Sequence, residues 1–343
     1  MPIEMSSFEI DPDIRKARTL SSEFYTDERW FELSKEKIFA RNWQFVAGPE
    51  LNANLTPITI LPGFLDEPVL ISKHGGELKC FSNVCTHRGK ILIDEPCSAS
   101  LIRCSYHGRR FSLDGKFLSM PEFDDVEDFP SQSDDLKPLA FSEWAGFKFA
   151  SLYPAAPFED FVKDAVARFD QVDPKALVLT SIRDYEVNAH WALYCENYLE
   201  GFHIPFVHNS LNEIVDYGNY TTEMFRYSSL QTGFNSYGEV AGRYLFVFPN
   251  LMFNFYPWGI SVNVVKPVTP SKSVVSFLTY VSDESKSGEG AGADLERVEL
   301  EDEVVVESVQ KGIRSRFYSH GKYSPTREQG THHFHRLIAE FMG

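Results

Sequence analysis

Two histidines in the C-terminal half of the chain are spaced so that they could share a metal ion, and a carboxylate precedes them. The residues are Glu200, His203 and His208, and Pro205 separates the two histidines. Proline disfavours a helical conformation of the residue before it, so a helix that carries Glu200 and His203 is expected to end at Ile204. His208 could then return towards His203. Two imidazoles and a carboxylate from elsewhere would bind mononuclear Fe(II) and leave coordination positions open; the alternative is two polar histidines near a helix end.

Two Cys–His pairs upstream have the residue types of an iron–sulfur site. The pairs are Cys85 with His87 and Cys104 with His107. In a Rieske 2Fe–2S cluster, two thiolates bind one iron and two imidazoles bind the other, which raises the reduction potential above that of an all-cysteine cluster. The alternatives are a zinc site, which uses the same ligand types, and cysteines that are simply buried. The sequence favours the Rieske interpretation, because a glycine follows each histidine closely, as expected where loops bring backbone amides near a cluster.

The segments around both groups resemble the α-subunits of Rieske non-haem iron oxygenases, the family of aromatic-ring-hydroxylating dioxygenases. The matching segments are 83–89, 104–111 and 200–208. The resemblance extends from about Ala17 to the C-terminus. It implies two cofactors, a Rieske 2Fe–2S cluster and a mononuclear Fe(II) ion. The implied cluster ligands are Cys85, His87, Cys104 and His107, and the implied iron ligands include His203 and His208.

The third iron ligand is implied by the resemblance to lie in the acidic segment 300–304. The family has an aspartate at the point that Asp302 occupies, so Asp302 is the predicted ligand. Glu301 and Glu303 are expected to point elsewhere, because successive residues of a helix are about 100° apart. A solvated helix face is the alternative for any acid in this segment.

Glu200 is expected to have a separate role. A carboxylate three residues before a metal-binding histidine can accept that histidine's second N–H and fix its tautomer. In the family, an acid here bridges to a cluster histidine of the neighbouring subunit, which in this chain would be His107. Because a head-to-tail contact must close into a ring, the resemblance implies a homotrimer or a multiple of three. Asn197 and Tyr198 lie beside this site in the sequence and are expected to hydrogen-bond within it.

The resemblance implies a terminal oxygenase that uses O₂ and electrons to hydroxylate a small organic substrate. The sequence has no flavin or nicotinamide fingerprint, so a separate NAD(P)H reductase or a ferredoxin is expected to supply the electrons. Glu200, where many members have aspartate, and the segment 308–313 resemble the branch that acts on choline, carnitine and betaines. Hydroxylation or demethylation of an N-methyl group is therefore predicted.

Two alternative functions remain open at this stage. The quaternary-ammonium branch often has Cys-Tyr-His where this chain has Gly201-Phe202-His203. Cis-dihydroxylation of an aromatic ring is therefore the alternative reaction. A Rieske electron carrier or redox sensor is the alternative from another class, but it needs no second metal motif. The long segment after Pro154 and the His203–His208 pair argue against a simple carrier.

Composition limits the partners and the compartment. The chain has 343 residues and a formal net charge of −16, which argues against nucleic acid and anionic membranes as partners. The charge is compatible with a cationic substrate or a basic redox partner. Five cysteines do not suggest a disulfide framework, and a reducing compartment is the simpler expectation. With no apolar run of membrane-spanning length and no leader sequence, we predict a cytoplasmic protein.

The pattern of elements predicts an α+β protein with two domains. Residues 1–42 should form a helical segment that packs on the catalytic domain, with one or two helices over 22–40. Residues 43–154 alternate short apolar strands with turns, which is typical of a small all-β Rieske domain. Residues 155–343 should form a larger helix-grip-like catalytic domain, with an antiparallel sheet and C-terminal helices. Predicted helices cover 158–169, 191–202, 296–318 and 327–343; predicted strands cover 178–187, 244–248, 251–255, 259–265 and 273–281.

Aromatic residues of this second domain are candidates for a cavity lining, with core packing as the alternative for each. They are Phe246, Phe248, Phe253, Phe255, Tyr256 and Trp258. The acidic, glycine-rich segment 283–294 is predicted to be a solvated loop.

Overall fold

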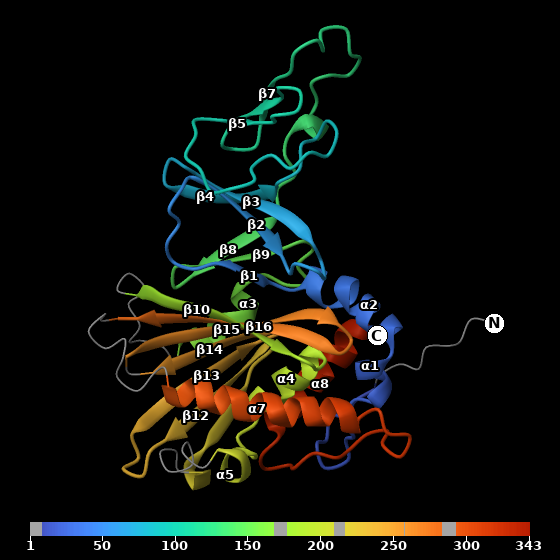
Figure 1. Cartoon of the computed structure of the whole chain (residues 1–343), viewed down its shortest axis with the longest axis vertical. Coiled ribbons are helices and arrows are strands. Elements are labelled where there is room, and N and C mark those ends of the chain that lie inside the picture. Colours follow the sequence, from blue (N-terminus) through green and yellow to red (C-terminus); the bar gives the residue numbers. More distant parts are fainter. Residues whose placement is uncertain (1–8, 168–176, 209–216, 257, 283–292) are drawn as a thin grey trace, which may run out of the picture. The chain divides into compact units, whose positions relative to one another are not determined.

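The computed structural model describes residues 9–167, 177–208, 217–256, 258–282 and 293–343. It divides into two compact units (Figure 1). One unit is Trp43–Pro154, and the other combines Met1–Asn42 with Ala155–Gly343. No helix among the described residues is long and apolar enough to cross a membrane.

The unit Trp43–Pro154 contains three small antiparallel sheets. The first has the order β1 (Gln44–Ala47), β9 (Phe147–Ser151), β8 (Ala140–Trp144). The second has the order β2 (Leu55–Ile60), β3 (Glu67–His74), β4 (Glu77–Ser82). The third has the order β5 (Ile102–Arg103), β6 (Arg110–Phe111), β7 (Phe117–Ser119). This all-β architecture is the predicted one.

A single apolar core supports the cluster loops of this unit. It contains side chains from the second and third sheets together with two of the predicted ligands. The residues include Leu55, Leu70, Phe81, Ile102, Phe111, Cys85 and Cys104. The hairpin between β3 and β4 turns at Gly75 and Gly76, whose φ angles of +56° and +88° suit glycine in a tight hairpin turn. Because Cys85 and Cys104 belong to this core, it holds the first predicted ligand of each loop in place.

The second unit is built on a seven-stranded antiparallel sheet. Its order is β10 (Val178–Val187), β16 (Lys272–Val281), β15 (Gly259–Thr269), β14 (Leu251–Tyr256), β13 (Val240–Val247), β12 (Ser228–Phe234), β11 (Thr221–Met224). The predicted strands are confirmed as β10 and β13–β16. The strands β11 and β12 were not predicted, because their serines, threonines and glutamine give no apolar alternation.

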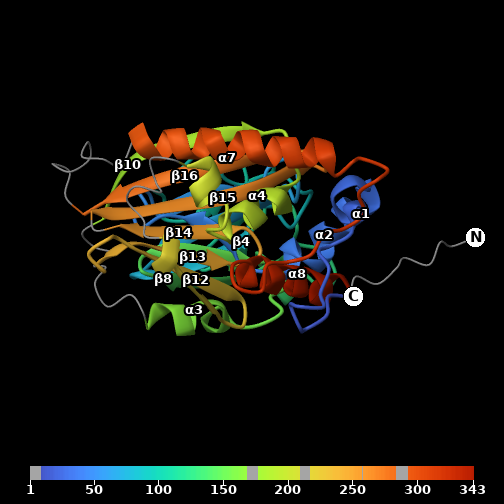
Figure 2. The ribbon, with the colours of Figure 1, turned by 90° about the horizontal axis from the view of Figure 1, so that it is seen from below.

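Helices cover this sheet and carry the site. They are α3 (Glu159–Val166), α4 (Trp191–Tyr198), α5 (Ile204–Val207), α7 (Ala293–Gly312) and α8 (Gln329–Met342). The long helix α7 runs along one side of the sheet, and α4 contacts both α7 and β15 (Figure 2). Residues of β14 and most of β15 are buried on both faces, as expected for strands with material on each side of the sheet.

The N-terminal segment forms two helices, as predicted. These are α1 (Ser22–Thr26) and α2 (Glu28–Lys37), and α2 contacts α8. Their aromatic side chains, including Phe24, Tyr25 and Phe31, are buried. The Tyr25 hydroxyl donates a hydrogen bond to Glu196 of α4 over 2.7 Å. The N-terminal helices thus contact α8 and also α4, the helix that precedes the His203 segment.

The predicted C-terminal boundary of the helix 296–318 is wrong. Helix α7 ends at Gly312 rather than at 318, because glycine weakens a helix and often ends it. Helix α3 ends at Val166, and the remainder of the predicted helix falls partly outside the described residues. The predicted loop 283–294 also lies almost entirely outside the described residues.

Gly330 provides a test of how closely α8 approaches the end of α4. A Cβ atom at Gly330 would lie 2.3 Å from the carbonyl oxygen of Leu199. Gly330→Ala should therefore lower the free energy of unfolding by about 1–3 kcal/mol, since the backbone of one helix must move. Denaturant titration followed by circular dichroism measures the loss.

The matched control is Gly312→Ala, whose added Cβ atom would meet nothing within 4 Å. This variant should be as stable as the parent, or slightly more stable. Equal stability of the Gly330 and Gly312 variants would contradict the close packing of α8 on Leu199.

Candidate metal centres

The two Cys–His loops have the same backbone hydrogen-bond pattern. In each loop the cysteine N–H donates to the carbonyl five residues later, and the glycine four residues later donates back to the cysteine carbonyl. The bonds are Cys85 to Lys90 (2.8 Å), Gly89 to Cys85 (3.0 Å), Cys104 to Arg109 (2.8 Å) and Gly108 to Cys104 (3.1 Å). Both glycines have positive φ angles, +70° and +78°, which other residues rarely adopt. The positive φ angle that each loop requires therefore explains why a glycine stands at this position.

The four side chains of these loops form two pairs, one of cysteines and one of histidines. Cys85 and Cys104 are buried, and their thiols hydrogen-bond to each other. The rings of half-buried His87 and exposed His107 have centroids 4.9 Å apart and planes at 71°. The structure therefore pairs the two predicted thiolate ligands in the interior and the two predicted imidazole ligands nearer to solvent.

Electrostatics in these loops suit a bound cluster. Burial raises the pKa of Cys85, and the adjacent Cys104 adds to this effect, so two thiolates need a cation beside them. Burial and the positive charges of neighbouring groups lower the pKa of His87, which keeps its imidazole neutral and able to bind metal. The residues present therefore fit a 2Fe–2S cluster with two thiolate and two imidazole ligands.

Arg109 holds the two loops together from a fully buried position that sequence reasoning did not identify. Its guanidinium pairs with Asp134 over 2.5 Å and lies over the ring of Phe117, 4.9 Å from the centroid. The carbonyl of Asp134 also accepts a hydrogen bond from Thr86 of the first loop over 2.9 Å. Asp134 thus contacts the first loop directly and the second loop through Arg109.

The segment that carries Glu200 and His203 is not helical, which corrects the predicted helix over 191–202. Helix α4 ends at Tyr198, and α5 begins at Ile204 with Pro205 in its first turn. Proline is well suited to a first turn, because its missing N–H would have no helical partner there. Glu200 caps the turn that leads into α5: its carboxylate accepts the backbone N–H groups of Phe202 and, over 3.1 Å, of His203. Pro205 therefore starts a helix rather than stopping one.

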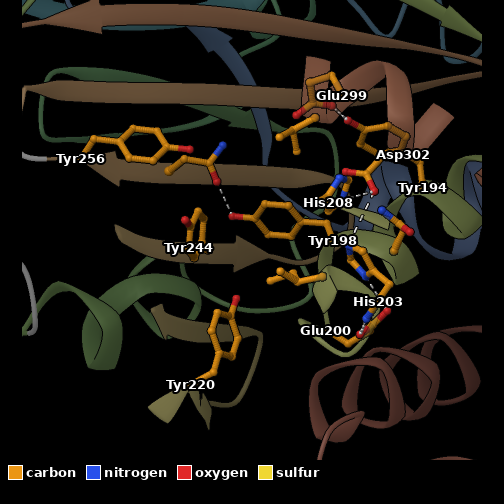
Figure 3. A pocket seen from close by; sticks show the side chains of 14 residues that line it. Tyr194, Tyr198, Glu200, His203, His208, Tyr220, Tyr244, Tyr256, Glu299 and Asp302 are labelled. Carbon is orange, nitrogen blue, oxygen red and sulfur yellow. Dashed lines mark hydrogen bonds and ion pairs between the residues drawn. The ribbon is translucent and has the colours of Figure 1, made fainter. Parts of the chain in front are cut away.

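The three predicted iron ligands converge on one point. Ligand atoms of His203, His208 and Asp302 all lie within 4.8 Å of one another. The Oδ1 atom of Asp302 is 3.0 Å from Nε2 of His208 and 3.5 Å from Nε2 of His203 (Figure 3). Asp302 comes from α7, and the histidines flank α5. Two imidazoles and one carboxylate in this arrangement suit Fe(II) with open coordination positions.

A second carboxylate stands behind each histidine. Nδ1 of His203 is 2.7 Å from Glu200, and Nδ1 of His208 is 2.9 Å from Glu301. Each acid can accept the Nδ1–H, which leaves the lone pair of Nε2 free to bind a metal ion beside Asp302. The expectation that Glu301 points away from the site is wrong, because it reaches the far nitrogen of the same ring. Its only sequence signal was its position next to Asp302.

The charge of this group calls for a cation. Burial of His208 favours its neutral form, but hydrogen bonds and charges of Asp302 and Glu301 outweigh this and raise its pKa. The same negative charges that favour a proton on His208 would also attract a metal ion. The donor set therefore fits an Fe(II) ion bound through the two Nε2 atoms and a carboxylate.

A pocket of about 130 Å³ opens beside these ligands and is dominated by tyrosine. Its lining comprises Tyr194, Asn197, Tyr198, Glu200, His203, Ile204, His208, Tyr220, Tyr244, Asn254, Tyr256, Val298, Glu299 and Asp302. The Tyr198 hydroxyl donates to Asn254 over 2.7 Å, and the Tyr194 hydroxyl donates to Glu299 (Figure 3). Burial raises the pKa of Tyr244 to about 12. The pocket therefore presents neutral phenols.

Sequence reasoning identified only part of this lining. Tyr256 is the one aromatic candidate that lines the pocket, whereas Phe246, Phe248, Phe253 and Phe255 are buried in the core. Asn197 and Tyr198 do face the pocket, as expected from their position in the sequence. The other tyrosines were missed, because they stand on separate elements and share no local pattern. They are Tyr194, Tyr220 and Tyr244.

Glu299 was also missed, although it is a carboxylate of the pocket wall one helical turn before Asp302. Burial, together with the negative charge of Asp302, raises its pKa to about 8. Its hydrogen-bond partner, Tyr194, is neutral. Like the group around His208, this carboxylate lies where a nearby positive charge would be favourable.

Family models match both units of the chain. Residues 57–130 match a Rieske [2Fe-2S] domain, and residues 219–343 match the catalytic domain of a ring hydroxylating alpha subunit.

Relatives with known names match nearly the whole chain. A chloroplastic choline monooxygenase of Arabidopsis thaliana is 30% identical over 96% of this chain and 85% of its own length. The carnitine monooxygenase oxygenase subunit of Escherichia coli (strain K12) is 30% identical over 95% of this chain and 94% of its own length.

Solved structures extend these similarities. The quaternary ammonium Rieske monooxygenase CntA in complex with L-carnitine has a TM-score of 0.81 and 28% identity, over 98% of this chain and 100% of that one. Naphthalene 1,2-dioxygenase with bound indole has a TM-score of 0.74 at 18% identity, over 95% and 92% of the two chains, which is a likeness of fold.

Asp134→Asn should destabilise the cluster loops, because it leaves the Arg109 guanidinium buried without a counter-charge. The expected loss is about 3–5 kcal/mol, seen as earlier loss of the visible cluster absorption on heating. The control is Asp114→Asn, which breaks the more exposed ion pair with Lys79 and should cost less than about 1 kcal/mol. Similar losses in both variants would refute the structural role of the buried pair.

Glu301→Gln should weaken iron binding without unfolding the protein. An outer carboxylate that orients a metal-binding histidine is worth about 10–100-fold in metal affinity. Iron content after dialysis against graded chelator concentrations measures the change. Glu303→Gln on the same helix removes the same charge and should leave the affinity unchanged; equal effects would mean that only the overall charge matters.

Proposed function

This chain belongs to the Rieske non-haem iron oxygenases, and from that premise we propose that it hydroxylates a small quaternary ammonium compound, at an N-methyl group as the sequence predicts. Membership of the family makes it an oxygenase with a 2Fe–2S cluster and a mononuclear iron. The observation that carries the substrate class is the tyrosine-rich, acidic pocket beside the three convergent ligand residues.

We assign the ligands on the geometry of the two sites. Cys85, His87, Cys104 and His107 would hold the cluster, and His203, His208 and Asp302 would hold the iron. When bound, the two groups supply single electrons and activate O₂. Glu200 and Glu301 keep the histidine Nδ1 atoms protonated, so that both rings present Nε2 to the same point.

A tyrosine pocket suits a quaternary ammonium group. Such a cation has no N–H to donate, so a protein recognises it through aromatic ring faces and nearby carboxylates. Five tyrosines and Glu299 provide both in this pocket. The named relatives act on choline and carnitine, which carry this group, and they support the same assignment.

Dihydroxylation of an aromatic ring has less support. The similarity to naphthalene 1,2-dioxygenase lies in the fold, at 18% identity. The pocket is small, about 130 Å³, and hydroxyl, amide and carboxylate groups stand on its wall. An aromatic hydrocarbon would offer no partner to the amide N–H groups of Asn254 and no positive charge to Glu299, which is unfavourable.

The proposal includes partners that would deliver electrons. Exposed His107 and the part-exposed Glu200 are suited to meet across a subunit boundary, so we propose a homotrimer in which electrons pass between protomers. The structure of the relative CntA is described as giving insight into inter-subunit electron transfer. A separate NAD(P)H reductase or a ferredoxin would reduce the cluster. The cytoplasm, which is reducing, is the compartment that this proposal assumes.

A single turnover of the reduced, iron-loaded protein tests the function. One panel holds trimethylammonium compounds, assayed for formaldehyde and hydroxylated product; the other holds aromatic hydrocarbons, assayed for cis-diols. We expect product from the first panel only. His208→Ala should abolish it, because two of three iron ligands do not suffice, while leaving the visible spectrum of the cluster intact.

His74→Ala is the matched control, since His74 is an exposed residue of the β3–β4 turn. This variant should keep full product formation. Cis-diols without amine products would overturn the proposed substrate class and make the pocket a site for aromatic rings.

A further inference from the structure

We propose that the pocket selects small quaternary ammonium compounds whose arm is uncharged and hydrogen-bonding, and excludes those with a carboxylate arm, with Glu299 as the residue that sets this preference. The inference rests on the proposed function and narrows it. The named relatives act on compounds of both kinds, since choline ends in a hydroxyl and carnitine in a carboxylate.

The charges of the pocket wall carry this proposal. The described lining includes the carboxylates Glu200, Glu299 and Asp302, but no lysine or arginine. Glu200 is paired with His203, and Asp302 lies between the two histidines. Glu299 differs from both, because the partner that the structure provides is the neutral hydroxyl of Tyr194. Burial raises the pKa of Glu299 to about 8, and a substrate cation beside it would favour the ionised carboxylate.

A substrate carboxylate, in contrast, would be bound unfavourably in this pocket. Within the described lining it would find no basic side chain, and it would lie in the same small pocket as Glu299 and Asp302. Burying a charge without a partner is unfavourable, and placing it near like charges adds repulsion. The same wall that attracts the ammonium group therefore rejects an acidic arm, which is how a site gains specificity against a close analogue.

An uncharged arm has suitable partners on the far side of the pocket. Tyr220, Tyr244 and Tyr256 stand on the side away from His203 and His208 (Figure 3). Phenolic hydroxyls can both donate to and accept from an alcohol. The Asn254 oxygen accepts from Tyr198, which leaves its amide N–H groups as further donors. This side of the pocket could bind a hydroxyl without any charged residue.

The size of the pocket agrees with this preference. A cavity of about 150 Å³ in another protein holds benzene, and the volume here is about 130 Å³. Choline is of similar size to benzene, whereas carnitine is longer by a carboxymethyl group. The longer substrate would have to displace part of the wall as well as bury its negative charge.

Binding measurements test the inference without relying on turnover. Isothermal titration calorimetry of the anaerobic, iron-loaded protein would compare choline, carnitine, γ-butyrobetaine and 3,3-dimethylbutan-1-ol, the neutral carbon analogue of choline. Choline should bind at least about tenfold more tightly than each of the others, a difference that corresponds to one strong charge interaction.

Variants then assign the preference to Glu299. Glu299→Gln should weaken choline binding about tenfold or more and bring it close to that of the neutral analogue. Glu303→Gln is the matched control, because Glu303 lies on the same helix but not on the described pocket wall. It should leave every affinity unchanged.

The possible results separate this inference from the proposed function. Tighter binding of carnitine or γ-butyrobetaine than of choline would overturn the inference and leave the proposed function standing. Unchanged choline binding in Glu299→Gln would remove the role of Glu299. Failure of all three ammonium compounds to bind, with binding of an aromatic hydrocarbon, would overturn both.

Discussion

The second unit depends on an excess of negative charge that only a cation can balance. Glu301 and Glu200 hold the outer nitrogens of the two histidines, and Asp302 lies between the inner ones. The His208 contacts join residues 93 and 94 positions apart in the chain, so tertiary packing must supply them. Packing of α4 between α7 and β15 brings these segments together, and the N-terminal helices support α4 through Tyr25. Much of the fold of this unit thus positions the small group of charged residues around His203 and His208.

The first unit holds its predicted cluster ligands with a local backbone geometry that is repeated in two loops. Its two loops share one backbone pattern, yet the histidine comes two residues after Cys85 in one loop and three after Cys104 in the other. Despite this offset, the two imidazoles contact each other and are both more exposed than the buried thiols. Exposed imidazoles suit electron exchange with a second molecule, whereas buried thiols protect the cluster from hydrolysis. One buried ion pair then fixes the two loops relative to each other.

Local sequence signals predicted the local parts of this structure. The Cys–His spacing, the strand patterns of β10 and β13–β16 and the two N-terminal helices all follow from neighbouring residues. Asp302 needed a family resemblance, since nothing in an acidic helix distinguishes one carboxylate from the next. Pro205 was misread because proline can stop a helix or start one, and here the Glu200 carboxylate caps the turn before α5. The tyrosines of the pocket could not be predicted from local sequence patterns, because only tertiary packing brings them together.

Helix α7 contributes three functional carboxylates within about one turn. Glu299 and Asp302 share a face, and Glu301 reaches His208 from beside them. These three residues stand on one rigid turn of α7. Any rotation of the helix that suited a new substrate would therefore also displace Asp302, the proposed iron ligand. The tyrosines carry no such linkage, because Tyr220, Tyr244 and Tyr256 belong to separate segments on the other side of the pocket. Natural or engineered changes of pocket shape should accordingly accumulate on the tyrosine side, while the orientation of the helix stays constant.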